Sequence, residues 1–438
     1  MTGDATSDAS SVAPALPERL RLLNIDLAGA PCGRLTHGST YVFQYGRDDP
    51  QQPSLSLLMP AGALQYADGA IFPAMDMNLP EGYLFQQIRE LFPKQPLTSM
   101  HLLALMGDNG IGRIGYSLPE RPRTKPASLV RKQDLLGSTK GQDVFRELMR
   151  AYLSTGAGIS GIQPKILVPD RATIPVPTLI VKVAAARYPG LAANEYMCLN
   201  AARHAGVEVS SFELSADGEL LVLDRFDIGT DGSRLGFEDI ASLMGLRVRD
   251  ALSDRKYRGS YQSVAEVLRL IGLADADLAR FYDQLAVCAM VRNGDGHLKN
   301  FGVLYSSDQD ARLAPMFDVV TTSIYPYQRY EGGPELEDRT MALRLFSGSR
   351  SKVYPPIEEL LDFGRAVCGV TQPQRVLQRI GEGMRKALEE ARHDDRIPGI
   401  LVSQMEGAWE SGLLYASAAG TATPRARSRL LSRKKSPP

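Results

Sequence analysis

The segment from Val291 to Tyr305, VRNGDGHLKNFGVLY, holds the densest group of polar residues whose types and spacing could do chemistry. Asp295 and Asn300 are separated by four residues, and Asp318 follows within the apolar run APMFDVV. A kinase needs one carboxylate near the acceptor hydroxyl and two oxygen ligands that hold magnesium against the nucleotide phosphates. Protein kinases supply these groups as Asp, four residues, Asn and a later Asp. The spacing favours phosphoryl transfer, although for the Asp–Asn pair alone a solvated loop is an equally good explanation.

The elements upstream have the order of a kinase amino-terminal lobe. GISGIQPKILV predicts a glycine-bearing turn and a strand, and TLIVKVA predicts a strand whose only charge is Lys182. A helix follows, LAANEYMCLNAARHAGV, with Glu195 near its first turn. A lysine on an apolar strand needs an anion, and a nucleotide phosphate with a helix carboxylate behind it would provide one. An edge-strand lysine that points to water is the alternative for this stretch alone.

The alternation of strand, helix and connector patterns predicts an α+β protein with an atypical two-lobed, protein-kinase-like fold. Short strand-like segments such as TYVFQYG and LSLLMP, and a helix that breaks into a strand in LTSMHLLALMGDNGIGRIGYSL, predict a small amino-terminal module. Segments such as FEDIASLMGL and LARFYDQLAVCAMVRN predict helices in the second half. The predicted division is a disordered 1–18, an α+β module 19–118, a connector 119–142, a kinase amino-terminal lobe 143–228, a helical carboxyl-terminal lobe 229–415 and a basic flexible tail 416–438.

Composition restricts the class of protein. The 438 residues contain 50 Lys and Arg against 50 Asp and Glu, so the net charge gives no general sign of binding to nucleic acid or anionic membranes. The basic tail could touch nucleic acid, but a solubilising end is the simpler interpretation. Four scattered cysteines without a C-x-x-C pair argue against a zinc site or a disulfide framework. No apolar run of membrane-spanning length and no secretory signal are present, so we expect a cytoplasmic protein without membrane contact.

The motifs taken together resemble one family of kinases. The matching segments, in the family's order, are LSLLMP, NLPEGYL, MGDNGIGRIGY, ISGIQPKILV, VKVA, YPGLAANEYMCLNAARHAGV, LDRFD, EDIASLMG, RNGDGHLKNFGVLY and APMFDVVTT. With these segments the chain resembles the HipA-type serine/threonine kinases, the toxin components of bacterial toxin–antitoxin pairs. The resemblance extends from about Arg19 to beyond Thr322.

The resemblance implies a role for individual residues and implies ATP and Mg²⁺ as cofactors. Asp295 would be the catalytic base, and Asn300 and Asp318 would hold magnesium. Ser160 matches the serine that family members phosphorylate on themselves, which ejects the phosphate loop and ends activity. The implied nucleotide-binding residues are Ile162, Gln163, Pro164, Lys165, Ile166 and Leu167 of the phosphate loop, Lys182, the hinge residues Asp224, Arg225 and Phe226, the catalytic-loop residues His297, Leu298, Lys299 and Asn300, and Phe317 and Asp318.

Several of these residues also have a structural explanation. Ser160 beside Gly161 could be turn chemistry, His297 could be a satisfied core histidine, and Phe226 could pack in the lobe core. Asp224 replaces the glutamate expected in the hinge, which matters little where the contacts come from the backbone. The loop ISGIQPK lacks both the G-x-G-x-x-G of protein kinases and the P-loop motif, as in the family that it resembles.

The resulting hypothesis is a HipA-like Ser/Thr kinase that phosphorylates a protein, as an example a translation component such as an aminoacyl-tRNA synthetase, and itself at Ser160, thereby arresting growth. The expected partner is a helix-turn-helix antitoxin of the HipB type, with DNA bound only through that partner. Two alternatives stay open: a non-catalytic nucleotide-binding regulator or co-repressor, and a small-molecule kinase of the aminoglycoside-phosphotransferase type. The ISGIQPK loop and the added first module argue against the last.

Overall fold

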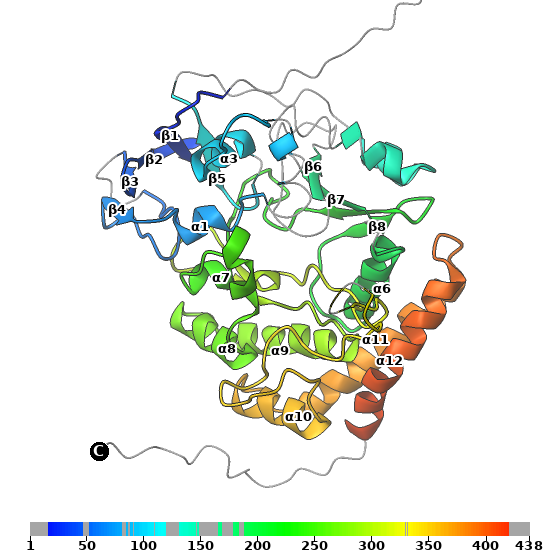
Figure 1. The fold of residues 1–438 in the computed structure, drawn as a ribbon. Coiled ribbons are helices and arrows are strands. Elements are labelled where there is room, and N and C mark those ends of the chain that lie inside the picture. The colour runs from blue at the N-terminus through cyan, green and yellow to red at the C-terminus, as the bar shows by residue number, and fades with distance from the viewer. Residues whose placement is uncertain are drawn as a thin grey trace, which may run out of the picture.

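The computed structural model describes residues 16–46, 52–80, 85, 88–90, 92–108, 110–119, 131–145, 147–148, 165–168, 178–183, 188–328, 330 and 332–419. Figure 1 shows the chain passing from a sheet-rich amino-terminal part to a helical carboxyl-terminal part. This arrangement confirms the predicted α+β class, with a small mixed module followed by a mainly helical region.

The amino-terminal module is built on a five-stranded antiparallel sheet in the order β4-β3-β2-β1-β5. Leu23 and Ile25 alternate with more exposed residues along β1, and Leu35 and Phe43 face the same core from β2 and β3. Its elements are β1 (Leu22–Leu27), β2 (Ala30–His37), β3 (Tyr41–Tyr45), β4 (Gln65–Asp68), α1 (Pro73–Asp76), α3 (Ser99–Met106) and β5 (Ile114–Ser117).

The predicted strand LSLLMP is wrong, because this segment forms only an isolated bridge between Ser56 and Met59. Its backbone has other partners: the Leu57 N–H donates to Glu238 and the Leu55 N–H donates to the Tyr45 hydroxyl. These contacts with distant residues take the hydrogen-bonding groups that a strand ladder would use.

A second sheet, in the order β6-β7-β9-β8, carries Lys182 and packs against helix α6. Lys182 lies on the central strand β7, paired with Lys165 on one side and Leu221 on the other. The helix starts after Gly190, whose φ of 71° is left-handed and suits glycine. The elements here are α4 (Lys132–Leu136), β6 (Lys165–Val168), β7 (Leu179–Val183), α6 (Leu191–His204), β8 (Phe212–Leu214) and β9 (Leu220–Asp224).

The carboxyl-terminal part is a group of helices with a short sheet, β10-β11-β12, at its edge. Helix α11 packs against α6, α9 and α12. In Figure 1, α10 lies at the bottom of the view, and α11 and α12 lie on the right, with α11 next to α6. The elements are β10 (Gly236–Asp239), α7 (Ile240–Leu243), η1 (Asp250–Tyr257), α8 (Tyr261–Leu270), α9 (Asp275–Met290), η2 (Leu298–Asn300), β11 (Gly302–Tyr305), β12 (Arg312–Leu313), α10 (Ile357–Ala366), α11 (Pro373–Arg392) and α12 (Gly399–Ala419).

The segment FEDIASLMGL was predicted as one helix, but it begins as strand β10 and becomes helical only at Ile240. The antiparallel pairing of Gly236–Asp239 with β11 fixes the first half. Asp239 then caps α7 by accepting from the Ser242 N–H at 2.7 Å. Long-range strand pairing therefore overrides the local helical pattern.

Buried polar groups connect the amino-terminal module to the rest of the protein. The Glu238 carboxylate, 1% exposed, accepts from the Ser56 hydroxyl at 2.8 Å and the Leu57 N–H at 2.7 Å on the module. On its own side it accepts from the Tyr305 hydroxyl at 2.9 Å. Burial raises the pKa of the Glu238 carboxyl, while these hydrogen bonds act in the opposite direction.

A second connection runs through a buried ion pair. The guanidinium of Arg225 forms a two-point contact with Asp227, and both side chains are fully buried. Arg225 also donates to the Gly110 carbonyl at 2.8 Å, and Asp227 accepts from the Gly112 N–H at 2.7 Å. The module is therefore attached through satisfied buried charges as well as apolar contacts.

All four cysteines are buried and free of disulfides. In the described part of the chain, no helix combines the length and the apolar character that crossing a membrane requires.

Removal of the Glu238 carboxylate tests the connection between the amino-terminal module and the rest of the protein. Glu238→Ala leaves the Ser56, Leu57 and Tyr305 donors without their acceptor, so we expect a loss of about 3–5 kcal/mol in the free energy of unfolding. Glu382→Ala, at an exposed position of α11, is the matched control and should change stability by less than about 0.5 kcal/mol. Urea unfolding measures both, and equal effects of the two substitutions would contradict the connection.

Candidate functional site

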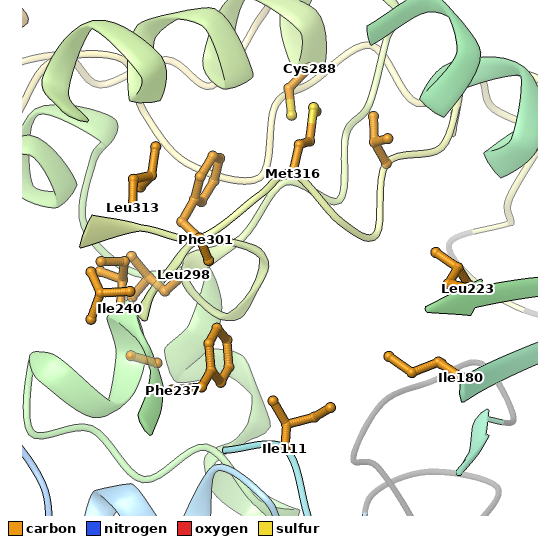
Figure 2. Close-up of a cluster of buried hydrophobic side chains, with 14 of the residues drawn as sticks. Ile111, Ile180, Leu223, Phe237, Ile240, Cys288, Leu298, Phe301, Leu313 and Met316 are labelled. Atoms are coloured by element: carbon orange, nitrogen blue, oxygen red, sulfur yellow. The ribbon is translucent and has the colours of Figure 1, made fainter. Parts of the chain in front are cut away.

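A cavity of about 620 Å³ lies where the four-stranded sheet, the short sheet and the loop after α9 meet. Figure 2 shows Ile180 and Leu223 projecting from the four-stranded sheet on one side, with Phe237, Ile111 and Met316 on the other. All five line the cavity. The cavity volume matches that of small-molecule sites in proteins.

Lys182 occupies the centre of one wall and is paired with two carboxylates. Its ammonium contacts Glu195 of α6 and Asp318, and the residue is 3% exposed. Burial by itself lowers the pKa of Lys182, but the two carboxylates outweigh burial and raise it. Lys182 is therefore a cation at neutral pH, and the alternative of an edge lysine that points to water is wrong.

Asp295 lies in the loop between α9 and η2 and lines the cavity. Its carboxylate accepts from the Tyr257 hydroxyl at 2.8 Å, and its backbone N–H donates to the Asn293 side chain at 3.1 Å. Gly294 precedes it at a position where an added Cβ would come within 2.3 Å of Asp338. The loop is thus fixed by side chains on both sides of the carboxylate.

Asn300 closes the short helix η2 and also faces the cavity. Its side-chain oxygen accepts from the His297 N–H at 3.1 Å, which orients the amide. Burial, together with the charges of Lys256 and Lys299, lowers the pKa of His297 well below its ordinary value. The imidazole is therefore neutral at pH 7.

Asp318 is held in an unusual backbone conformation, with a φ of 54°. This left-handed conformation is uncommon for residues other than glycine and often marks functional sites. Three residues later, Thr321 donates its hydroxyl to the Val291 carbonyl at 2.7 Å and its N–H to Asn194 at 2.8 Å. Trp409 of α12 donates to the same hydroxyl at 2.7 Å. Thr321 therefore ties the Asp318 segment to α6, to α12 and to the end of α9.

A group of three aromatic rings forms another part of the cavity wall. The rings of Phe226 and Phe317 stack with centroids 5.2 Å apart, and Phe237 contacts both rings at 5.3 and 5.9 Å. Flat apolar surfaces of this kind suit an aromatic base. Lobe packing and a ligand wall are compatible roles for Phe226, because the ring both packs and lines the cavity.

The hinge residues differ in what they offer to a ligand. The N–H groups of Asp224 and Arg225 donate to the carbonyls of Ser211 and Thr178, each at 2.9 Å. The Phe226 N–H has no acceptor among the residues that the structure describes. Phe226 is therefore the hinge residue whose N–H could meet a base.

Most of the predicted site residues that can be placed come together around the cavity. Those that line it are Lys182, Asp224, Phe226, Asp295, His297, Lys299, Asn300, Phe317 and Asp318. The side chains of two others point elsewhere: Arg225 pairs with Asp227, and Leu298 lies beside Ile240 in the core (Figure 2). Ser160 and Ile162, Gln163 and Pro164 lie outside the described residues, and only the backbone of Lys165, Ile166 and Leu167 is described, as part of β6.

The sequence did not point to several residues that the fold brings to the site. Tyr257 lies at the end of η1 and is bonded to Asp295, while Met77, Asn78 and Ile111 reach the cavity from the amino-terminal module. The Lys299 ammonium donates to the Met77 carbonyl at 3.1 Å. Asn78 and Ile111 lie in the matching segments NLPEGYL and MGDNGIGRIGY, but no local pattern assigned them to the site, because their place at the cavity depends on tertiary contacts.

The donor set suits magnesium. Asn300 and Asp318 supply one amide and one carboxylate oxygen to the same cavity. Magnesium binds few protein oxygens and keeps sites for water and phosphate oxygens, so such a sparse set of hard ligands is typical of nucleotide sites. The residues present therefore fit the ion that the kinase hypothesis requires.

Two family models match this chain. The HipA N-terminal domain matches residues 23–117, and the HipA-like C-terminal domain matches residues 157–391. Among curated proteins, the chain is similar to "Putative kinase Y4dM" and "Putative kinase Y4mE" of Sinorhizobium fredii. The first is 26% identical, with 70% of this chain and 78% of the relative covered, and the second is 28% identical, with 70% and 79% covered.

A solved structure shares the fold. The complex described as the Shewanella oneidensis MR-1 toxin–antitoxin system HipA, HipB and its operator DNA contains a chain that superposes with a TM-score of 0.62. The sequence identity is 18%, and the match covers 90% of this chain and 97% of the other. The fold is therefore the one predicted from the sequence.

Loss of the Lys182 charge tests the buried ion pairs. Lys182→Met leaves Glu195 and Asp318 without their cation, so we expect about 3–5 kcal/mol of destabilisation at pH 7. Without the ammonium, the two carboxylates are uncompensated negative charges in the folded protein, which disfavours their ionised form. Stability is then present at low pH and lost as the pH rises, so the deficit should shrink toward about pH 4.

The matched control is Lys132→Met. Lys132 also pairs with two carboxylates, Glu213 at 3.1 Å and Asp224 at 2.9 Å, but both partners are about half exposed. Exposed pairs contribute little, so a loss of about 1 kcal/mol or less is expected. Chemical unfolding at several pH values measures both variants, and a pH-independent deficit for Lys182→Met would contradict the charge argument.

Proposed function

This chain belongs to the HipA-like family, and we propose that it is a Ser/Thr protein kinase that transfers the γ-phosphoryl group of ATP to a protein. The observation that supports this most is the convergence of Lys182, Asp295, Asn300 and Asp318 on one cavity, as the kinase template requires. The similarity to relatives named as kinases agrees with a phosphotransferase.

In the proposed reaction the acceptor is a hydroxyl group beside Asp295. Asp295 accepts the hydroxyl proton, the acceptor oxygen forms a bond to the γ-phosphorus, and the bond from phosphorus to the β–γ bridging oxygen breaks. ADP leaves with the electron pair of that bond. The Tyr257 hydroxyl, 2.8 Å from Asp295, holds the carboxylate toward the acceptor.

The remaining residues bind the nucleotide. The base would lie against Phe226, Phe237 and Phe317, with the Phe226 N–H as a donor to its ring nitrogen. Lys182 would meet the phosphates, with Glu195 behind it. Magnesium, when bound between Asn300, Asp318 and the phosphates, would offset the phosphate charge during transfer.

The identity of the acceptor and the regulation of the enzyme belong to the same proposal. The resemblance supports a protein acceptor such as a translation component, for instance an aminoacyl-tRNA synthetase, and a growth-arresting effect. It also supports autophosphorylation of Ser160. The complex of HipA with HipB and operator DNA supports a HipB-like antitoxin partner for this chain, with DNA bound through that partner.

Transfer from γ-labelled ATP tests the activity. Purified protein with Mg²⁺ should label itself or an added protein, and Asp295→Asn should lower the rate about 10²- to 10⁴-fold because the general base is lost. Asp362→Asn, which changes a partly exposed carboxylate of α10, is the control and should keep the wild-type rate. Intact mass before the assay identifies preparations already phosphorylated, and Ser160→Ala shows how much label goes to that residue.

The same assay separates the alternatives. ATP binding without transfer by wild-type protein and Asp295→Asn alike would contradict the kinase and favour a nucleotide-binding regulator. Transfer to kanamycin-type small molecules but to no protein would favour a small-molecule kinase.

A further inference from the structure

Lys256 is a buried lysine that lines the cavity and has no role in the reaction proposed above. It is 5% exposed and lines the cavity near the end of η1. Its ammonium lies 5.3 Å from the centroid of the Tyr257 ring, but no carboxylate or other hydrogen-bond acceptor among the described residues pairs with it. A buried ammonium in this situation is costly unless an anion meets it.

The other described lysines of the cavity are already engaged. Lys182 is paired with Glu195 and Asp318, and Lys299 donates to the Met77 carbonyl at 3.1 Å. Lys256 therefore differs from both in having a positive charge available to a ligand.

The backbone next to Lys256 is fixed in relation to the catalytic loop. The neighbouring Tyr257 donates its hydroxyl to Asp295 at 2.8 Å, and its carbonyl accepts from the Lys352 ammonium at 3.0 Å. The Lys256 charge also contributes to the lowered pKa of His297, two residues after Asp295. Lys256 thus lies on the Asp295 side of the cavity, where the proposed transfer takes place.

We propose that the Lys256 ammonium binds the γ-phosphoryl group of the nucleotide and stabilises the charge on its oxygens during transfer. This inference rests on the proposed kinase function. The anion must be small and must enter the cavity, because 5% exposure leaves little of Lys256 accessible from outside. A γ-phosphoryl group meets both conditions.

The test compares nucleotides with and without this group. With Lys256→Met, calorimetry in Mg²⁺ should show ADP affinity within about twofold of wild type and β,γ-imido-ATP affinity reduced about tenfold or more. The kcat of phosphate transfer should fall about 10²-fold, as for loss of one donor to developing charge. Lys256→Arg keeps the positive charge, so its affinity for β,γ-imido-ATP should return close to the wild-type value.

Control variants separate a loss of phosphate binding from a loss of folding or of acceptor binding. Lys386→Met, at an exposed position of α11, should match wild type in every measurement. If thermal unfolding shows that Lys256→Met is destabilised, Lys256→Gln supplies a neutral variant with a polar head. A higher KM for the protein acceptor with unchanged nucleotide affinities would overturn the proposal in favour of an acidic acceptor residue.

Equal loss of ADP and imido-ATP affinity, or no loss of either, would also overturn it. Failure of the kinase proposal gives a different result, because wild-type protein would then transfer no phosphate. The difference between ADP and imido-ATP affinity still reports whether Lys256 meets the third phosphate in that case.

Discussion

The pairing of the buried Lys182 ammonium with two carboxylates is the interaction on which the site depends. One carboxylate comes from a helix that packs on the four-stranded sheet, and the other comes from a loop of the helical part. Because an unpaired buried charge is costly, these three elements are kept together even without a ligand. The same charges that stabilise the fold are those that a nucleotide and its metal ion would use in the proposed kinase reaction.

Contacts of two further residues, Thr321 and Arg292, hold the segments that carry Asp318 and Asp295. Thr321 links the Asp318 segment to α6, α9 and α12, so the backbone strain at Asp318 is supported by three helices. Arg292, which precedes the Asp295 loop, has its guanidinium 4.5 Å from the centroid of Tyr354 and donates to Ser411 of α12 at 2.8 Å. The carboxyl-terminal helices therefore act as a rigid base for both acidic loops.

The sequence predicted the parts of the site that depend on local spacing. Asp295, Asn300 and Asp318 could be found because their order and separation follow a chemical template, and Lys182 because a single charge interrupts an apolar strand. Tyr257 and Met77 could not be found, since neither residue differs locally from an ordinary surface or core position. The strand in FEDIASLMGL was missed for a related reason: its pairing with β11 is long-range, while its local pattern is helical.

Because the amino-terminal module contributes part of the cavity wall, the module and the rest of the chain are expected to evolve together. Met77, Asn78 and Ile111 belong to the segment matched by one family model, and the Asp295 loop belongs to the segment matched by the other. A change in either segment alters the surface that the other must fit, so substitutions in the two should be selected together. A chimaera that exchanges only one segment between distant relatives would break the hydrogen bonds from Lys299 to the Met77 carbonyl and from Ser56 to Glu238. A chimaera that exchanges both segments together would preserve them.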